Sequence, residues 1–192
     1  MSKDIFSLEG KNALVTGANT GLGQAMAVAL ADAGADIALV GRSAPDETEA
    51  RIKALGRNVA VVMADLGDTS QITRVVTEAE QALGPIDILV NNAGIIRRED
   101  SIKFNESDWD DVMSVNLKVP FFLAQAVAQS MIATKRRGKI INVASLLSFQ
   151  GGIRVPSYTA SKSGLAGLTR LLANEWAPHS INVNGIVPGY FA

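Results

Sequence analysis

The sequence predicts an α/β protein with a doubly wound parallel sheet, a Rossmann fold of three layers (α/β/α) with helices on both faces. Three observations support this prediction. Short apolar segments alternate with longer amphipathic ones along the chain, as βαβ units require. Glycines follow three of the amphipathic segments, where helices commonly stop. A glycine-rich segment, Thr16-Gly17-Ala18-Asn19-Thr20-Gly21-Leu22-Gly23, directly follows the first apolar segment.

The apolar, often β-branched segments are predicted as six strands that are covered on both faces. They are Asn12–Thr16, Asp36–Gly41, Asn58–Ala64, Ile86–Asn91, Lys139–Ala144 and Ile181–Val187. Right-handed crossovers between them give the strand order 3-2-1-4-5-6. Such a sheet binds ligands at the carboxyl ends of its strands.

The amphipathic segments between the strands are predicted as helices. They are Gly21–Ala33, Asp46–Leu55, Thr69–Leu83, Ser107–Ala133 and Ser157–Trp176. The first three stop at Gly34, Gly56 and Gly84. Asp68 is placed to cap the start of the third helix.

Composition limits the possible functions. With 192 residues, 47% apolar residues and a mean hydropathy of +0.18, the chain can bury a core as one domain over residues 1–192. The 18 basic and 19 acidic side chains are scattered, which argues against a nucleic-acid or membrane partner. Without cysteine and with a single histidine, the chain has no thiolate or multi-histidine metal site, and no metal is expected, although an all-carboxylate site stays open. No signal peptide or membrane span is recognisable, so we expect a cytoplasmic protein.

The glycine-rich segment is predicted to bind a nucleotide. A strand that ends in glycines and opens into a helix lets the backbone approach a pyrophosphate, which the helix N-terminus attracts. The spacing G-x-x-x-G-x-G differs from the G-x-G-x-x-G fingerprint, so context has to support the assignment. The candidate cofactor-binding residues of this turn are Gly17, Asn19, Thr20, Gly21, Leu22 and Gly23.

Tyr158 and Lys162 form the candidate catalytic pair. They are four residues apart on a predicted helix and therefore share one face. The lysine ammonium favours the phenolate, which makes the phenol useful for general acid–base chemistry. Ser145 ends the preceding strand, from which its hydroxyl can bind a substrate oxygen beside Tyr158. Asn116 lies in the middle of a helix, an unfavourable place for asparagine unless it has a role there.

Taken in order, these motifs resemble the short-chain dehydrogenase/reductase family over essentially the whole chain. The resemblance rests on Thr16-Gly17-x-x-x-Gly21-x-Gly23, Asn91-Asn92-Ala93-Gly94, Asn116, Ser145, Tyr158-x-x-x-Lys162 and Pro188-Gly189. It implies hydride transfer between a nicotinamide and a carbonyl carbon. Tyr158 would then exchange the proton, Ser145 would position the oxygen, and Lys162 would tune Tyr158 and hold the nicotinamide ribose.

The resemblance also assigns supporting roles. Asn116 would hold an ordered water in a proton relay. Asp65 would meet the adenine with Leu66 beside it, although a turn role for Asp65 stays open. Further cofactor-binding positions are Asn92, Ala93, Gly94, Pro188 and Gly189, in addition to Tyr158 and Lys162.

The end of the second strand selects the cofactor, because an acidic residue there binds the ribose of NAD whereas a cation accommodates the 2′-phosphate of NADP. This strand ends in Val40-Gly41-Arg42-Ser43, without a carboxylate. Arg42 therefore favours NADP, with NAD as the alternative.

For the substrate, residues 91–100 and 145–158 are similar to one branch of the family, the 2-deoxy-D-gluconate 3-dehydrogenases, also called 2-dehydro-3-deoxy-D-gluconate 5-dehydrogenases. These act on six-carbon sugar acids, whose carboxylate calls for a guanidinium or a dipolar donor. Arg154, between Ser145 and Tyr158, is the first candidate, and Arg97 or Arg98 is the second.

Alternative functions remain at this point. Within the enzyme class they are a gluconate 5-dehydrogenase and a 3-oxoacyl carrier-protein reductase, and the scattered charges do not indicate a docking patch for a carrier protein. A nucleotide-sensing protein without catalysis is the alternative from another class.

The resemblance further implies a homo-dimer or homo-tetramer that pairs through the last two predicted helices. Relatives continue past Pro188-Gly189 through a threonine that meets the nicotinamide, a mobile substrate loop, a helix and a strand. The C-terminal part of the family fold is therefore missing from this sequence.

Overall fold

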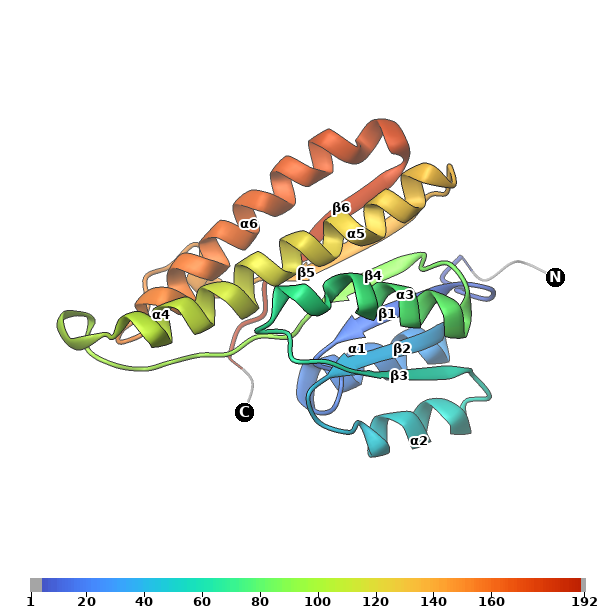
Figure 1. The fold of residues 1–192 in the computed structure, drawn as a ribbon, viewed down its shortest axis with the longest axis horizontal. Helices are drawn as coiled ribbons and strands as arrows, with labels where there is room; N and C mark the ends of the chain where they lie inside the picture. The colour runs from blue at the N-terminus through green and yellow to red at the C-terminus, as the bar shows by residue number, and fades with distance from the viewer. Residues whose placement is uncertain (1–4, 191–192) are drawn as a thin grey trace.

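The computed structural model describes residues 5–190 and contains a six-stranded parallel sheet with helices on both faces (Figure 1). The strands are β1 (Asn12–Thr16), β2 (Asp36–Gly41), β3 (Val59–Met63), β4 (Ile88–Asn91), β5 (Gly138–Val143) and β6 (Ile181–Ile186). They follow the order β3-β2-β1-β4-β5-β6, which confirms the predicted fold class and strand order.

The sheet reverses its winding direction between β1 and β4. Val15 of β1 pairs with Leu39 of β2 on one side and with Val90 of β4 on the other. The carboxyl ends of these strands therefore lie at one edge, and the glycine-rich turn that follows β1 lies at the switch point where doubly wound sheets bind ligands.

The helices are α1 (Gly21–Asp32), α2 (Asp46–Ala54), α3 (Ile72–Leu83), α4 (Glu106–Met113), α5 (Val119–Ala133) and α6 (Pro156–Trp176). Gly34, Gly56 and Gly84 follow the first three with φ angles of 107°, 74° and 91°, so the predicted glycine stops are confirmed. Asp68 accepts a hydrogen bond from Ser70 N at 2.9 Å and caps the short helix η1 (Thr69–Gln71) ahead of α3. Within residues 5–190 no helix is both long enough and apolar enough to cross a bilayer.

The prediction of one continuous α-helix over 107–133 is wrong, because the middle of this segment is not α-helical. A π-helical turn, η3 (Ser114–Lys118), separates α4 from α5. Asn116 lies in this turn and is fully buried. The wider turn lets the chain place a polar side chain inward, and π turns of this kind occur frequently at functional sites.

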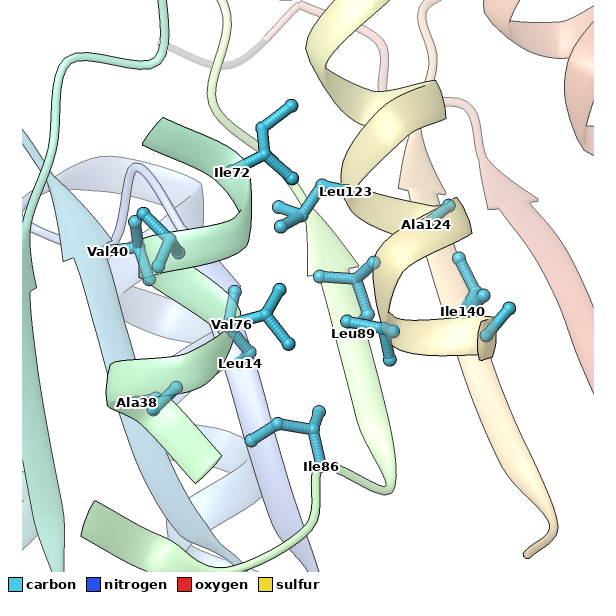
Figure 2. Packing of buried hydrophobic residues seen from close by; sticks show 14 of the residues in the cluster. Leu14, Ala38, Val40, Ile72, Val76, Ile86, Leu89, Leu123, Ala124 and Ile140 are labelled. Carbon is cyan, nitrogen blue, oxygen red and sulfur yellow. The ribbon is translucent and has the colours of Figure 1, made fainter. Parts of the chain in front are cut away.

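The core consists of two apolar layers, one on each face of the sheet. On one face, Leu14, Leu89 and Ile140 of the strands pack against Val76 of α3 and Leu123 of α5 (Figure 2). α6 adds Leu172 and Trp176 to this layer. On the other face α1 and α2 cover the sheet, with Ala27, Ala31 and Ile52 against Val15 and Ile37. The alanines of α1 leave room for that helix to approach the sheet closely.

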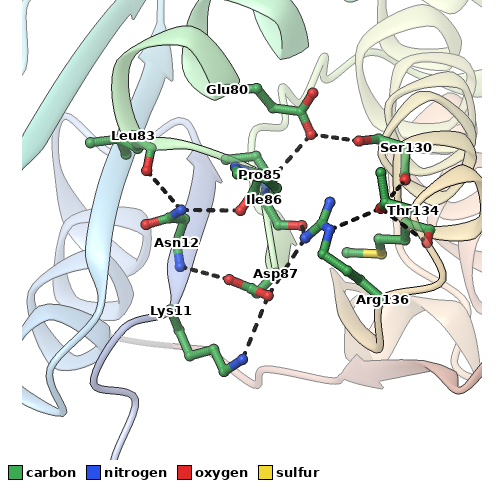
Figure 3. A network of polar contacts seen from close by, with 11 residues as sticks. Lys11, Asn12, Glu80, Leu83, Pro85, Ile86, Asp87, Ser130, Thr134 and Arg136 are labelled. Atoms are coloured by element: carbon green, nitrogen blue, oxygen red, sulfur yellow. Dashed lines mark hydrogen bonds and ion pairs between the residues drawn. The ribbon is translucent and has the colours of Figure 1, made fainter.

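A polar network fixes the opposite, amino-terminal edge of the sheet (Figure 3). The Asp87 carboxylate accepts a hydrogen bond from Asn12 N at 3.1 Å and lies 3.6 Å from the cationic nitrogens of both Lys11 and Arg136. The Asn12 side chain donates to the carbonyl of Leu83 at the end of α3. These contacts tie β1, β4 and the ends of two helices together, away from the ligand-binding edge.

Candidate active site

Two neighbouring cavities open at the carboxyl edge of the sheet. The glycine-turn cavity has a volume of about 660 Å³ and is lined by the glycine-rich turn and the ends of β2, β3 and β4. The Tyr158 cavity has a volume of about 410 Å³ and is lined by the ends of β5 and β6 and the start of α6. Leu22, Asn92, Gly94 and Ile95 line both cavities, so the two form one continuous groove.

The glycine-rich turn is packed too tightly for larger residues. A Cβ at Gly23 would lie 2.1 Å from the carbonyl oxygen of Gly17 and 2.4 Å from Asn92 Nδ2. Gly17 itself has a φ of 64°. The Thr20 side chain makes no capping hydrogen bond at the start of α1. The first-turn N–H groups of α1 can therefore bind an anion.

Hydrogen bonds lock this turn to the end of β4. Thr16 Oγ1 accepts from the main-chain N–H groups of Asn92 and Ala93, both at 3.0 Å. In return Asn92 Nδ2 donates to the carbonyls of Thr16 and Gly17 at 2.9 and 3.1 Å. The groove between the two strand ends is thus preformed.

Thr48 is a contributor that the sequence reasoning missed. It lies in the first turn of α2 and is fully buried. Its hydroxyl donates to the carbonyl of Ala18 at 2.8 Å and accepts from Gln24 Nε2 at 3.0 Å. In the sequence it looks like any threonine near a helix start, so no signal marks it as a support of the glycine-rich turn.

At the outer end of the groove lie Arg42, Asp65 and Leu66, which all line the glycine-turn cavity. Arg42 follows the end of β2 and is exposed, and its guanidinium has no ion-pair partner among residues 5–190. Asp65 Oδ1 accepts from Gly67 N at 2.8 Å, so the turn role that the sequence left open exists alongside its place at the cavity.

Three of the four predicted catalytic residues, Ser145, Tyr158 and Lys162, line the Tyr158 cavity together. Lys162 is only 4% exposed, and its Nζ donates to the Val143 carbonyl at 2.6 Å. The same Nζ lies 5.8 Å from the centre of the Tyr158 ring. Burial lowers the pKa of Lys162 from 10.5 to about 8. The ammonium is therefore held next to the phenol in a poorly solvated place.

Ser145 is fixed by a short helix that begins directly after it. Its Oγ accepts from Leu147 N at 3.2 Å, and its main-chain N donates to Ser148 Oγ at 3.3 Å. Ser148 Oγ in turn donates to the carbonyl of Lys162 at 2.8 Å. Ser148, which the sequence analysis did not single out, therefore connects Ser145 to the helix that carries Lys162.

Asn116 lines neither cavity and lies behind the wall of the groove. Its Oδ1 accepts from Ile95 N at 2.8 Å, its Nδ2 donates to Ile95 O at 2.8 Å, and Nδ2 also lies 3.3 Å from Ser161 Oγ. A Cβ at Gly94 would lie 3.3 Å from Asn116 Oδ1 and 3.6 Å from Lys162 Nζ. Asn116 is thus a buried support behind Gly94 and Ile95.

Arg154, the first choice for a carboxylate partner, does not line the Tyr158 cavity, and its guanidinium is paired with two acidic side chains. Its Nε lies 3.0 Å from Asp100 Oδ1 and its Nη2 3.6 Å from Glu99 Oε1. Arg97 is likewise paired, with Asp108 at 3.0 Å. Arg98, a second choice from the sequence, lines the Tyr158 cavity.

Most of the remaining predicted cofactor-binding residues line one of the two cavities. Asn19, Thr20 and Ala93 line the glycine-turn cavity, and Pro188 and Gly189 line the Tyr158 cavity. Gly21 lines neither of them. It begins α1 with a φ of 58°, so it shapes the turn.

Comparisons with known proteins show the family of the chain. The sequence pattern of the family described as short chain dehydrogenase matches residues 11–192. A protein of Dickeya dadantii named 2-dehydro-3-deoxy-D-gluconate 5-dehydrogenase is 58% identical over 192 residues, which is 100% of this chain and 76% of the relative. The Escherichia coli protein of the same name is 59% identical over 187 residues, covering 97% of this chain and 74% of the relative.

A solved structure is also similar. It comes from Agrobacterium tumefaciens, is described as a proposed 2-deoxy-D-gluconate 3-dehydrogenase and contains bound NADP. It is 60% identical, has a TM-score of 0.92, and the match covers 98% of this chain and 74% of that one. Fold, site geometry and sequence together lead to one assignment: the chain belongs to the short-chain dehydrogenase family.

Proposed function

We propose that this protein is an NADP(H)-dependent oxidoreductase that interconverts a hydroxyl and a ketone of 2-dehydro-3-deoxy-D-gluconate, a six-carbon sugar acid. The observation that carries the proposal is that Ser145, Tyr158 and Lys162 line one cavity that continues into the glycine-turn cavity. The names of the two curated relatives, 58% and 59% identical, supply the substrate.

The groove fits a dinucleotide. The glycine-rich turn is closely packed, because a Cβ at Gly23 would collide with Gly17 and Asn92. The absence of side chains at its glycines lets a pyrophosphate approach the main chain. The start of α1 would hold the pyrophosphate, and Asp65 and Leu66 would flank the adenine. Gly94 lines both cavities, and Pro188 lines the Tyr158 cavity. When bound, the nicotinamide supplies the donor or acceptor of the hydride.

The chain's own groups handle the proton. In alcohol oxidation the Tyr158 phenolate oxygen takes the proton of the substrate hydroxyl, and in ketone reduction the phenol returns it to the carbonyl oxygen. Ser145 donates a hydrogen bond to that same oxygen and holds it beside Tyr158. The charged form of Lys162 stabilises the phenolate across the poorly solvated gap.

NADP is the cofactor that the residues favour. Arg42 is exposed at the glycine-turn cavity, where a guanidinium can bind the 2′-phosphate of NADP. No acidic residue occupies the end of β2, where NAD-binding folds place one. The solved relative with bound NADP supports the same choice.

The charge of the Tyr158 cavity supports an anionic substrate. Its lining in the described chain contains two cationic residues, Arg98 and Lys162, and no aspartate or glutamate. Because Lys162 faces Tyr158, Arg98 is the group left for the substrate carboxylate. The cavity thus offers Arg98 for the carboxylate of the substrate and Tyr158, with Ser145 and Lys162, for proton transfer at its hydroxyl group.

A substrate panel tests the proposal. The complete protein is mixed with NADP(H) or NAD(H) and with 2-dehydro-3-deoxy-D-gluconate, D-gluconate, 5-keto-D-gluconate and a 3-oxoacyl carrier protein, and the absorbance of reduced nicotinamide is followed. The highest kcat/KM is expected for 2-dehydro-3-deoxy-D-gluconate. A higher value for gluconate or the carrier protein would replace the substrate assignment. Cofactor binding without turnover of any compound would favour a nucleotide sensor.

The Tyr158→Phe variant tests the proton-transfer step in the same assay. It removes the hydroxyl while the ring and its packing stay. A loss of kcat of about a hundredfold or more is expected, with cofactor binding retained in a fluorescence titration. Unchanged kcat would contradict the role of Tyr158.

We also propose that the helices α5 and α6 pair with a second copy of the chain in a homo-dimer or homo-tetramer. A groove of about 530 Å³ between α4, α5 and α6 is mostly apolar, and it is lined by Asp110, Met113, Ser114, Leu117, Lys118, Phe121, Phe122 and Leu168. Phe122 is 38% exposed there. Sedimentation should show that Phe122→Glu dissociates the assembly, whereas the control Leu55→Glu, at an exposed position directly after α2, does not. Equal assemblies for both variants would contradict this pairing.

A further inference from the structure

Arg154 has an unusual backbone conformation. It lies in the loop between β5 and α6 with a φ of 63°, in the left-handed region that residues with a Cβ seldom adopt. Such a conformation persists only where surrounding contacts hold it, and it occurs most often at functional sites. The contacts of Arg154 therefore need an explanation beyond a solvated surface arginine.

Three contacts join Arg154 to two consecutive residues of the loop after β4. The main-chain N–H of Glu99 donates to the Arg154 carbonyl at 3.1 Å. The guanidinium places Nε 3.0 Å from Asp100 Oδ1 and Nη2 3.6 Å from Glu99 Oε1. We call this set of three residues the Arg154 clasp. It links loops that are about fifty residues apart in the sequence.

The two linked loops both contribute to the lining of the Tyr158 cavity. The loop after β4 contributes Ile96 and Arg98, and the loop before α6 contributes Ile153 and Val155. Arg98 directly precedes Glu99, and Ile153 and Val155 flank Arg154. Any change in the distance between the clasped residues therefore moves lining residues on both loops.

The clasp also determines which cation of this region stays free. Arg97 is paired with Asp108 and Asp111, and Arg154 is paired with Glu99 and Asp100. Arg98 lies between these pairs, and no ion pair is found for it in the described part of the chain. Because Arg154 pairs with the two acidic neighbours of Arg98, the guanidinium of Arg98 is left available to pair with a ligand in the cavity.

We propose that Arg154 is a positioning residue, which with Glu99 and Asp100 holds the two loops at a fixed separation and keeps Arg98 directed at the substrate carboxylate. The predicted effect on substrate binding rests on the proposed function. The link between the two loops is independent of that function, and it can be measured on the protein without substrate or cofactor.

Steady-state kinetics of Arg154→Asn, Asp100→Asn and the double variant test the effect on substrate. Asparagine tolerates the left-handed conformation, so Arg154→Asn removes the guanidinium with little backbone change. Each single variant is expected to raise the KM for the sugar acid about threefold, as the loss of exposed ion pairs allows, with the KM for NADP(H) unchanged. The double variant should be no worse than Arg154→Asn alone, because both changes break the same link.

The same series separates the clasp from direct binding. If Arg154 itself bound the substrate carboxylate, Asp100→Asn would free it and leave the KM unchanged or lower it, and that result would overturn the proposal. Arg137→Asn is the matched control, since Arg137 is exposed just before β5, at the amino end of the sheet. It should leave the KM for the sugar acid unaltered.

Hydrogen exchange of the free protein measures the tether itself. The amide of Glu99, which donates to Arg154, should exchange about tenfold faster in Arg154→Asn, and Arg98→Gln should leave it unchanged. Unchanged exchange in Arg154→Asn would overturn the clasp. Faster exchange in a protein that turns over no sugar acid would instead overturn the proposed function and retain the clasp as a loop tether.

Discussion

The side-chain amide of Asn116 and the main chain of Ile95 are joined by two hydrogen bonds of 2.8 Å, one in each direction. Ile95 lines both cavities of the groove. Asn116 therefore fixes the segment at which the glycine-turn cavity and the Tyr158 cavity meet. The π turn of η3 is the local distortion that brings its side chain there.

Asn116→Ala is expected to impair both folding and catalysis. It leaves the N–H and the C=O of Ile95 without their partner, which costs about 2 kcal/mol of unfolding free energy. Displacement of the groove wall next to Lys162 should lower kcat about tenfold or more. Urea unfolding and steady-state kinetics check the two effects.

Asn105→Ala is the matched control for this variant. Asn105 caps α4 by accepting from Asp108 N at 2.8 Å, and it lies outside both cavities. Its loss should cost about 1 kcal/mol without a change in kcat. If Asn116→Ala behaved in the same way as this control, Asn116 would be a stability residue only.

The outline of the fold is predictable because it follows from local patterns. Apolar segments and glycine stops place every strand and most helix ends within two residues of their observed bounds. The π turn escapes prediction, because residues 107–133 keep a continuous helical pattern. Asn116 in this turn makes a long-range contact with Ile95, which no local pattern reports.

Lys162 predicts a specific pH dependence of stability. Its pKa in the folded protein is about 8, below the 10.5 of the free side chain, because burial disfavours the charge. Between these pH values the unfolded chain binds more protons, so stability rises with pH through this window. Below pH 8 the buried charge of Lys162 lowers the unfolding free energy by its full amount, about 3 kcal/mol. This loss disappears above the pKa that the side chain has in the unfolded chain.

The Lys162→Met variant isolates this contribution. It keeps the length of the side chain and removes the charge. Between pH 7 and pH 11 the unfolding free energy of the wild type should therefore rise by about 3 kcal/mol relative to that of the variant. Urea unfolding at intermediate pH values gives the difference curve. A difference that does not vary with pH would show that Lys162 titrates in the folded protein as it does in the unfolded chain.

Arg42→Ala tests the cofactor assignment. If the guanidinium binds the 2′-phosphate, its loss removes a charge-assisted hydrogen bond, and the KM for NADP(H) should rise about tenfold or more while that for NAD(H) changes little. Arg51→Ala, on the neighbouring helix α2 and outside both cavities, is the matched control. Equal changes with both cofactors would remove the assignment of Arg42.

The site was predictable where chemistry follows strand ends and helix spacing. Tyr158 and Lys162 share a face because they are four residues apart, and Ser145 lies at a strand end beside them. The direction of Arg154 was not predictable. Its nearness to Tyr158 in the sequence suggested the cavity, but the acidic partners that turn it away lie in another loop.

Thr48→Val tests whether a fully buried hydroxyl outside the groove governs cofactor binding. Valine keeps the shape of the side chain but leaves the carbonyl of Ala18 and the amide of Gln24 without their partner. Unfolding free energy should fall by about 1–2 kcal/mol, and the KM for NADP(H) should rise about fivefold because the glycine-rich turn loses its support. The proton-transfer residues are untouched, so kcat should stay within about twofold.

Two further variants assign the Thr48 effect to the hydroxyl. Thr48→Ser keeps the donor and acceptor and should restore the KM for NADP(H). Thr134→Val removes an exposed hydroxyl that donates to Ser130 O at the end of α5, and it should leave that KM unchanged. If Thr48→Val lowered stability while the KM for NADP(H) stayed at the wild-type value, the groove would hold its shape without this hydrogen bond, and the close packing at Gly23 alone would define the turn.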